Sequence, residues 1–154
     1  MKLIPLRNGS LAIIDDEDFE RVSQYRWSTK VKNGRHYAFS PDLINGKGIY
    51  MARLIMGSPD GMLVDHISMD TLDNRKSNLR VATKAQNGMN RGKPRTNKSG
   101  FKGVHFEKFS NKWRACISAN GVSKKFTRRN TPEEAFRDYV QACNEMHGEF
   151  ARHN

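Results

Sequence analysis

The residues best suited to chemistry are an adjacent acid and histidine, Asp65 and His66, followed at fixed distances by two amides, Asn78 and Asn87. The acid–histidine pair interrupts an apolar stretch, residues 63–67. Hydrolysis of a phosphodiester needs a base that takes a proton from water and positive charge that stabilises the phosphorane and the leaving oxygen. A histidine suits the first task, and a carboxylate that holds a divalent cation suits the second. The set therefore indicates a small nuclease with one metal and one general base.

The four side chains divide the work. His66 would accept the proton, Asp65 would give the metal a hard carboxylate oxygen, and Asn87 would add a neutral carbonyl oxygen. Two protein oxygens leave room for water and substrate phosphate, which favours Mg²⁺, with Mn²⁺ as a possible substitute. Asn78 would hydrogen-bond either the loop or the histidine ring and so fix the ring. Simpler interpretations also exist: the acid and histidine as a surface hydrogen-bonded pair, Asn78 and Asn74 as turn residues, and Asn87 as a helix-surface residue.

Three local elements must position this set. Residues 63–67 predict a short strand, so that Asp65 and His66 lie at its end. Residues 68–77 are polar and typical of turns, and Asn78 follows them on a returning loop or strand. Thr83 can cap a helix that runs through Met89 and carries Asn87.

The preceding residues predict a scaffold of short elements rather than a site. We expect strands where β-branched or aromatic residues cluster, a capped helical turn after two aspartates, and a glycine-containing turn. These are strands at 11–14, 36–39 and 49–51, the helical turn at 17–22 and the turn at 45–48.

Charge indicates a polyanionic partner. The 154-residue chain has 27 Lys and Arg against 16 Asp and Glu, for a formal net charge of +11. Twelve of the basic residues and a single acid, Glu107, lie between Met89 and Asn130. Residues 91–100 are basic and contain no apolar side chain that can pack, which predicts a linker. We therefore expect three segments: 1–90 with the site at 49–90, the linker 91–100, and a second module at 101–154.

The second module predicts a three-stranded antiparallel sheet packed on one helix. Its expected strands are 101–106, 113–117 and 122–126, and Asn120-Gly121 is a favoured two-residue hairpin turn. Thr131-Pro132-Glu133-Glu134 forms a capping box with proline at the first helical position. Apolar residues at helical spacing follow and would cover one side of the sheet.

The uncovered side of that sheet is the expected DNA surface. Strand alternation turns Trp113, Ala115 and Ile117 toward the helix and Arg114 away from it, so Arg114 is the main candidate for a base or phosphate contact. Further candidates for DNA contact are basic residues of the sheet and one arginine of the first segment, for which a solvated side chain is the simpler interpretation. They are Lys102, His105, Lys124, Lys125, Arg128 and Arg53.

Two family resemblances add to this reading. The first is carried by residues 51–56, 64–67, 72–80 and 83–87, and covers roughly 49–90. These residues resemble the HNH nucleases, in the variant whose last motif histidine is replaced by asparagine. The spacing is similar to that of HNH homing endonucleases of phages and mobile elements. The resemblance implies a ββα-metal site with Asp65 and Asn87 as metal ligands, His66 as general base and Asn78 as the orienting amide. Relatives commonly carry a histidine where this chain has Ala52.

The second resemblance covers most of residues 99–151 and is carried by 99–104, 112–117, 131–135 and 147–151. This text is similar to the plant ethylene-response-factor (AP-two) DNA-binding domain, which also occurs attached to HNH nucleases. It implies duplex DNA as the partner. Cys116 and Ser118 stand where plant members have reading residues, so the target sequence cannot be carried over.

The sequence thus predicts an α+β chain that acts as a metal-dependent endonuclease on double-stranded DNA. One alternative, suggested by Ala52, is a DNA-binding regulator with an inactive or attenuated HNH domain. Another is an RNA-binding protein. Cys116 and Cys143 have no zinc-site spacing and are expected to be buried free thiols of a reducing compartment. The absence of a long apolar run or a signal peptide predicts a cytoplasmic protein without a membrane partner. The sequence names neither a protein partner nor an oligomeric state.

Overall fold

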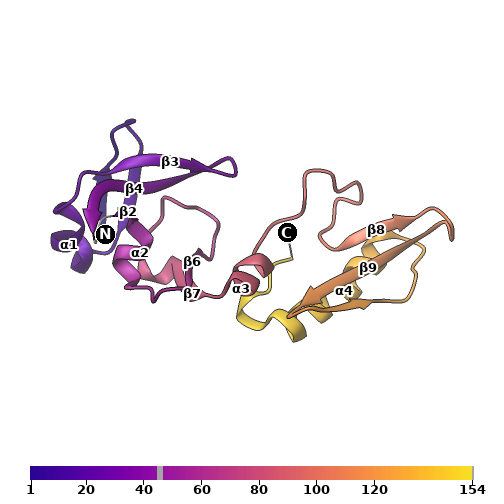
Figure 1. The fold of residues 1–154 in the computed structure, drawn as a ribbon. Helices are drawn as coiled ribbons and strands as arrows, with labels where there is room; N and C mark the ends of the chain where they lie inside the picture. The colour runs from indigo at the N-terminus through magenta and orange to yellow at the C-terminus, as the bar shows by residue number, and fades with distance from the viewer. Residues whose placement is uncertain (45–46, 154) are drawn as a thin grey trace. The chain divides into compact units, whose positions relative to one another are not determined.

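The computed structural model describes residues 1–44 and 47–153, which form an α+β chain of small sheets and few helices (Figure 1). The chain divides into two compact units, residues 1–84 and 85–154, and each is described by itself. The division falls six residues before the basic segment 91–100, for which the structure shows neither helix nor strand.

The first unit begins with a β-hairpin and a short helical segment. Strand β1 (Lys2–Pro5) pairs antiparallel with β2 (Leu11–Ile14), and a 3-10 turn, η1 (Asp16–Asp18), leads into α1 (Phe19–Ser23). The predictions of β2 and of the helical turn are confirmed. The sequence analysis did not predict β1, where alternate residues turn Ile4 into the core and leave Leu3 exposed.

A three-stranded antiparallel sheet follows, in the order β3 (Ser28–Lys32), β4 (Arg35–Ile44), β5 (Lys47–Tyr50). The predicted strand at 36–39 is confirmed within β4, and the predicted turn at 45–48 lies partly outside the described residues. The third predicted strand was misplaced, because it runs from Lys47 to Tyr50 and Met51 starts helix α2 (Met51–Met56). Gly57, with φ of 54°, ends that helix in the left-handed conformation that glycine tolerates best.

The site segment is a two-stranded antiparallel hairpin. Strand β6 (Leu63–His66) pairs with β7 (Leu79–Ala82), and the long connection between them ends in the 3-10 turn η2 (Lys76–Asn78). The core of this unit gathers side chains of β1, β2, β4, α1, α2 and β7. Its buried members are Ile4, Leu6, Ala12, Ile14, Val22, Trp27, Ala38, Met51, Ala52, Ile55 and Leu79.

The second unit contains the predicted sheet and helix. Strands β8 (Val104–Glu107), β9 (Lys112–Ala119) and β10 (Val122–Lys125) form a sheet in the order β10-β9-β8, and α4 (Pro132–His147) packs on it. Asn120 and Gly121 both have positive φ, which confirms the hairpin turn. Thr131 and Glu134 form the predicted capping box. Ala115, Ile117, Tyr139 and Cys143 are buried where the two layers meet, and η3 (Gly148–Phe150) follows α4.

The helix at the division between the units is α3 (Lys84–Met89), as predicted after Thr83. Among the described residues, no helix is long and apolar enough to cross a membrane.

Candidate functional site

The predicted metal ligand Asp65 is a buried carboxylate with a cation already beside it. Asp65 and Arg80 face each other across the β6–β7 hairpin. The Nε and Nη2 atoms of Arg80 lie 2.9 and 2.8 Å from Oδ2 of Asp65. The two side chains are only 6% and 12% exposed, so the ion pair is screened from water. Arg80 was not among the predicted site residues, because its position opposite Asp65 depends on the register of the β6–β7 hairpin.

The predicted general base His66 is also buried, and an amide holds its ring. Nε2 of His66 lies 3.3 Å from Oδ1 of Asn74, while Nδ2 of Asn74 donates to the Leu72 carbonyl at 3.0 Å. Because the Asn74 oxygen faces the ring, this contact favours the tautomer with the proton on Nε2 and the lone pair on Nδ1. The ring of Tyr37 packs edge-on against His66, with a centroid separation of 6.1 Å. These contacts favour one tautomer of His66 and hold its ring in one orientation.

Burial is the main influence on the His66 pKa, which it lowers below the ordinary 6.5. The Asn74 hydrogen bond and the nearby Asp65, Asp70 and Asp73 act in the opposite direction but do not restore it. A lowered pKa keeps the imidazole neutral near pH 7, which is the form that can accept a proton.

Asn78 makes three hydrogen bonds to the connecting loop and none to the histidine ring. Its Oδ1 accepts from the Ser68 amide at 2.9 Å, and its Nδ2 donates to the carbonyls of Asp73 at 2.8 Å and Asp70 at 3.3 Å. Of the two roles left open for Asn78, the structure therefore shows the loop contact. The residue that orients the ring is Asn74, which the sequence analysis treated as a turn residue.

The scaffold elements hold the site loop in place. The Ile13 amide donates to the Leu72 carbonyl at 2.8 Å, and the Asn74 amide donates to the Ile13 carbonyl at 2.7 Å. The Lys76 amide donates to Asp15 at 2.8 Å, and its ammonium pairs with Glu17. Asn74 therefore reaches His66 because strand β2, about sixty residues earlier in the chain, fixes its backbone.

The second predicted metal ligand, Asn87, is half-buried on α3 and belongs to the second unit. The pairing of Asp65 with Asn87 therefore remains a prediction. Within the described residues, no three His, Cys, Asp or Glu side chains cluster in a way that could hold a metal ion. The donors that fit a hard divalent cation are thus few, but the Asp65 carboxylate already accommodates a cation, the Arg80 guanidinium.

Two residues of α2 are part of the fold. Ala52 is buried in the core at 6% exposure, so the histidine common in relatives would not fit there without repacking. Arg53 donates to the Met62 carbonyl at 2.8 Å and the Pro59 carbonyl at 3.0 Å, and lies 3.5 Å from Asp60. These contacts tie down the loop between α2 and β6 and argue against Arg53 as a phosphate contact.

A cluster of cations around Glu107 marks the sheet of the second unit. Arg114 donates from Nη1 to Glu107 Oε1 at 2.9 Å and from Nε to the Phe126 carbonyl at 2.8 Å. Arg128 donates to Glu107 Oε2 at 2.6 Å, and His105 lies 3.9 Å from Oε1. The hydrogen bonds from Arg128 and Arg114 lower the Glu107 pKa to about 2. Glu107 thus holds two arginines in fixed positions on the side of the sheet away from α4.

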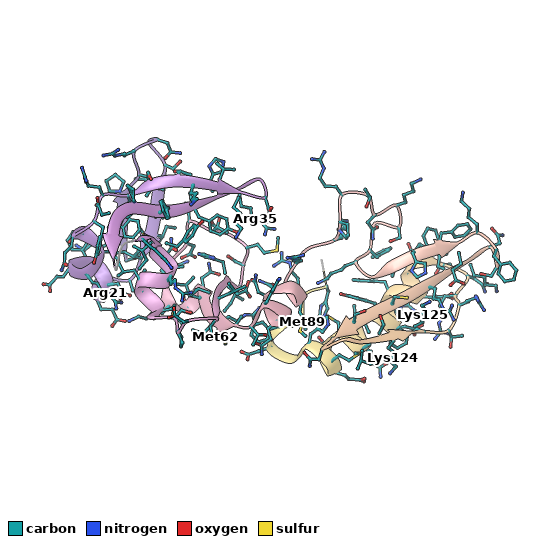
Figure 2. The ribbon with its side chains drawn as sticks, viewed as in Figure 1. Arg21, Arg35, Met62, Met89, Lys124 and Lys125 are labelled. Atoms are coloured by element: carbon teal, nitrogen blue, oxygen red, sulfur yellow. The ribbon has the colours of Figure 1, made fainter. Side chains whose placement is uncertain are left out.

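Other predicted basic residues differ in how they are held. Lys124 and Lys125 are exposed on β10 (Figure 2), as expected. Lys102 was predicted on the first strand, but β8 begins only at Val104. The Lys102 ammonium donates to the Met89 carbonyl at 2.8 Å and the Arg152 carbonyl at 3.0 Å, and burial lowers the pKa of Lys102. Lys102 therefore links the backbone at Met89 to that at Arg152 and does not lie on the open face of the sheet.

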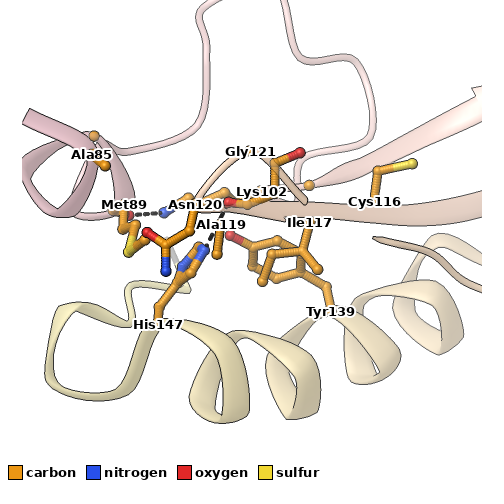
Figure 3. Close-up of a pocket in the computed structure, with 13 residues that line it drawn as sticks. Ala85, Met89, Lys102, Cys116, Ile117, Ala119, Asn120, Gly121, Tyr139 and His147 are labelled. Carbon is orange, nitrogen blue, oxygen red and sulfur yellow. Dashed lines mark hydrogen bonds between the residues drawn. The ribbon is translucent and has the colours of Figure 1, made fainter. Parts of the chain in front are cut away.

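Lys102 lines a pocket of about 380 Å³ within the second unit (Figure 3). Gly103 is required there, because a Cβ would lie 2.2 Å from the Tyr139 ring at a φ of 73°. His147 sits 3.1 Å from the Ser118 carbonyl and 3.5 Å from the Cys143 sulfur. The side chains of Lys102 and His147 are thus engaged by the fold itself.

Both cysteines are free thiols, as predicted. Cys143 is buried, but Cys116 is half-exposed on β9, so the expectation that both are buried was wrong. Strand alternation explains the difference, since Ala115 and Ile117 take the buried side.

Comparison with known proteins identifies the class of the chain. Residues 50–89 match the sequence model of the HNH endonucleases. The chain is 35% identical over 94 residues to Protein 3.8 of Escherichia phage T7, an alignment that covers 61% of the chain and 77% of that relative. It is 29% identical over 147 residues to an uncharacterized HNH endonuclease of Acanthamoeba polyphaga mimivirus, covering 95% and 75%. No solved structure matches it significantly.

Residues 50–89 form a domain of the HNH endonuclease family. This family consists of nucleases that act on DNA and generally use a divalent metal.

Proposed function

We propose that this chain is a metal-dependent endonuclease that hydrolyses phosphodiester bonds of double-stranded DNA, by nicking or by cutting both strands. The observation that carries the proposal is a buried, neutral His66 whose ring is fixed by Asn74, directly beside the buried carboxylate of Asp65. A surface hydrogen-bonded pair would be exposed, whereas both side chains are at most 6% exposed.

In the proposed reaction, His66 takes the proton of the attacking water on Nδ1, the nitrogen with the lone pair. Asn74 keeps Nε2 protonated and holds the ring plane through the reaction. Asp65, together with Asn87, would hold the divalent cation, most suitably Mg²⁺. When bound, that cation would stabilise the charge on the phosphate and the leaving oxygen. Asn78 keeps the connecting loop in the shape that presents Asn74.

The second unit would bind the duplex. We assign this role to the side of the β8–β9–β10 sheet that α4 does not cover, in an AP-two-like domain of residues 101–154 behind the basic segment 91–100. The supporting observation is that Arg114, Arg128 and His105 gather there around Glu107 and that Lys125, which pairs with Cys116 on this side of the sheet, is exposed. Phosphate contacts of this kind weaken steeply as salt rises. The viral relatives support a role in the cytoplasm of an infected host cell.

The alternative, a DNA-binding regulator with an inactive HNH domain, depended on Ala52. Because Ala52 fills a core position on α2, its presence is explained by packing and gives no reason to prefer the regulator.

A plasmid assay separates the two functions. Supercoiled DNA incubated with the protein and Mg²⁺ should become nicked or linear, and EDTA should stop the conversion. DNA binding without cleavage under every metal condition would instead support the regulator. Preferential binding of duplex RNA in a competition assay would contradict a DNA substrate.

A further inference from the structure

Arg80 forms a buried ion pair with Asp65, the proposed metal ligand. A carboxylate that is 6% exposed needs a compensating positive charge, because an unpaired buried charge is strongly destabilising. Arg80 supplies that charge through two contacts to a single oxygen, Oδ2, at 2.8 and 2.9 Å. The positive charge that compensates this carboxylate therefore comes from a side chain of the protein itself.

A divalent ion on the same carboxylate would lie next to the guanidinium. Like charges at such short range, away from water, repel strongly. The ion and the guanidinium therefore compete for Asp65, and each weakens the binding of the other to this carboxylate.

We propose that Arg80 is the resident counterion of Asp65 and that a divalent metal ion must displace it, so that Arg80 sets the metal concentration at which the site loads. The inference rests on the proposed function, because it takes Asp65 as a metal ligand. By reciprocity, metal binding loosens the β6–β7 ion pair to the same extent that the ion pair weakens metal binding.

Direct binding of Mn²⁺ to the full-length protein, measured by paramagnetic resonance or calorimetry without DNA, tests this inference. Arg80→Gln should bind Mn²⁺ about tenfold more tightly than the parent protein, or better, since the competing charge is gone. Arg80→Lys keeps a charge but loses the second contact, and should bind Mn²⁺ with intermediate affinity. Unchanged or weaker binding by Arg80→Gln would overturn the inference.

Arg75→Gln is the matched control. Arg75 makes a comparable two-point ion pair with Asp73 in the adjoining loop, at 2.8 and 2.6 Å, and Asp73 is not among the proposed ligands. This variant should bind Mn²⁺ as the parent protein does. An equal gain in Arg75→Gln would show a general charge effect and would also overturn the role of Arg80.

Thermal melting provides a check on folding and a second readout. Without metal, Arg80→Gln should melt below the parent protein, because the buried ion pair with Asp65 is lost. Mn²⁺ should then raise its melting temperature more than it raises that of the parent protein. Asp65→Asn should abolish Mn²⁺ binding in both backgrounds. If the parent and Arg80→Gln both fail to bind Mn²⁺, the proposed metal site fails along with the inference.

Discussion

The hydrogen bond between Asn74 and His66 allows a sharp test of the general base. Replacing Asn74 with aspartate puts a negative charge where the neutral amide oxygen now lies, 3.3 Å from Nε2. That charge stabilises the imidazolium form, so the His66 pKa should rise in Asn74→Asp. Only neutral His66 can accept a proton from water, so cleavage falls as pH falls through this pKa.

The size of the shift follows from the distance and the burial. Unit charges about 3.3 Å apart interact by roughly 5 kcal/mol at an effective dielectric near 20. The cost of burying the new carboxylate and the charged ring offsets much of this interaction energy. We therefore expect the His66 pKa to rise by about one to two units. In the parent protein, burial holds the pKa below 6.5. The acid limb of the cleavage profile should therefore lie below pH 6.5 in the parent and about one to two units higher in Asn74→Asp.

The assay is single-turnover plasmid cleavage with saturating Mg²⁺ between about pH 5 and 9. Asn74→Ala completes the series: without the oxygen that fixes the tautomer, cleavage should fall roughly tenfold to a hundredfold while DNA affinity stays unchanged. Asn8→Asp, in the exposed turn between β1 and β2, adds the same charge elsewhere in the same unit and should leave the profile in place.

An acid limb at the same pH in Asn74→Asp and the parent would refute this account of Asn74. Full cleavage by Asn74→Ala would refute it independently, because that variant removes the contact without adding charge.

Three further predictions test the fold around the site and the DNA surface. Asn78→Ala loses three hydrogen bonds to the site loop and should lower the free energy of unfolding by about 2–3 kcal/mol in urea titration; an unchanged midpoint would contradict the loop role. Ala52→His places an imidazole in the core and should destabilise by about 1–3 kcal/mol without raising the cleavage rate per folded molecule; a large gain in cleavage would revive the attenuated-enzyme hypothesis. Glu107→Gln removes the acid between Arg114 and Arg128 and should tighten non-specific DNA binding with a steeper salt dependence in fluorescence anisotropy; weaker binding would show that Glu107 positions the arginines productively.

Local signals predicted local structure well. The Asn120-Gly121 turn, the Thr131 capping box and the strand carrying Asp65 and His66 depend on residues a few positions apart, and each is confirmed. The same signals failed at boundaries, as at Met51, where the sequence predicted a strand and the chain begins a helix.

The contacts of the site residues could not be predicted from the sequence, because they join residues that are far apart in the chain. Asn74 looks like any turn asparagine, and only the pairing of its backbone with Ile13 brings its amide to His66. The choice of Asn78 between loop and ring, and the partner of Asp65, likewise depend on the loop shape and the hairpin register. The residue types indicate a reaction, whereas the partner of each site residue is determined by tertiary contacts.

The central claim is that His66 removes the proton from water, and His66→Ala tests it most directly. Single-turnover cleavage of supercoiled plasmid should be measured for His66→Ala and the parent protein at saturating Mg²⁺, with DNA affinity and thermal melting recorded on the same samples. We predict that cleavage falls roughly a hundredfold to ten-thousandfold while DNA affinity is unchanged. A folded His66→Ala protein that cuts as fast as the parent would contradict the claim.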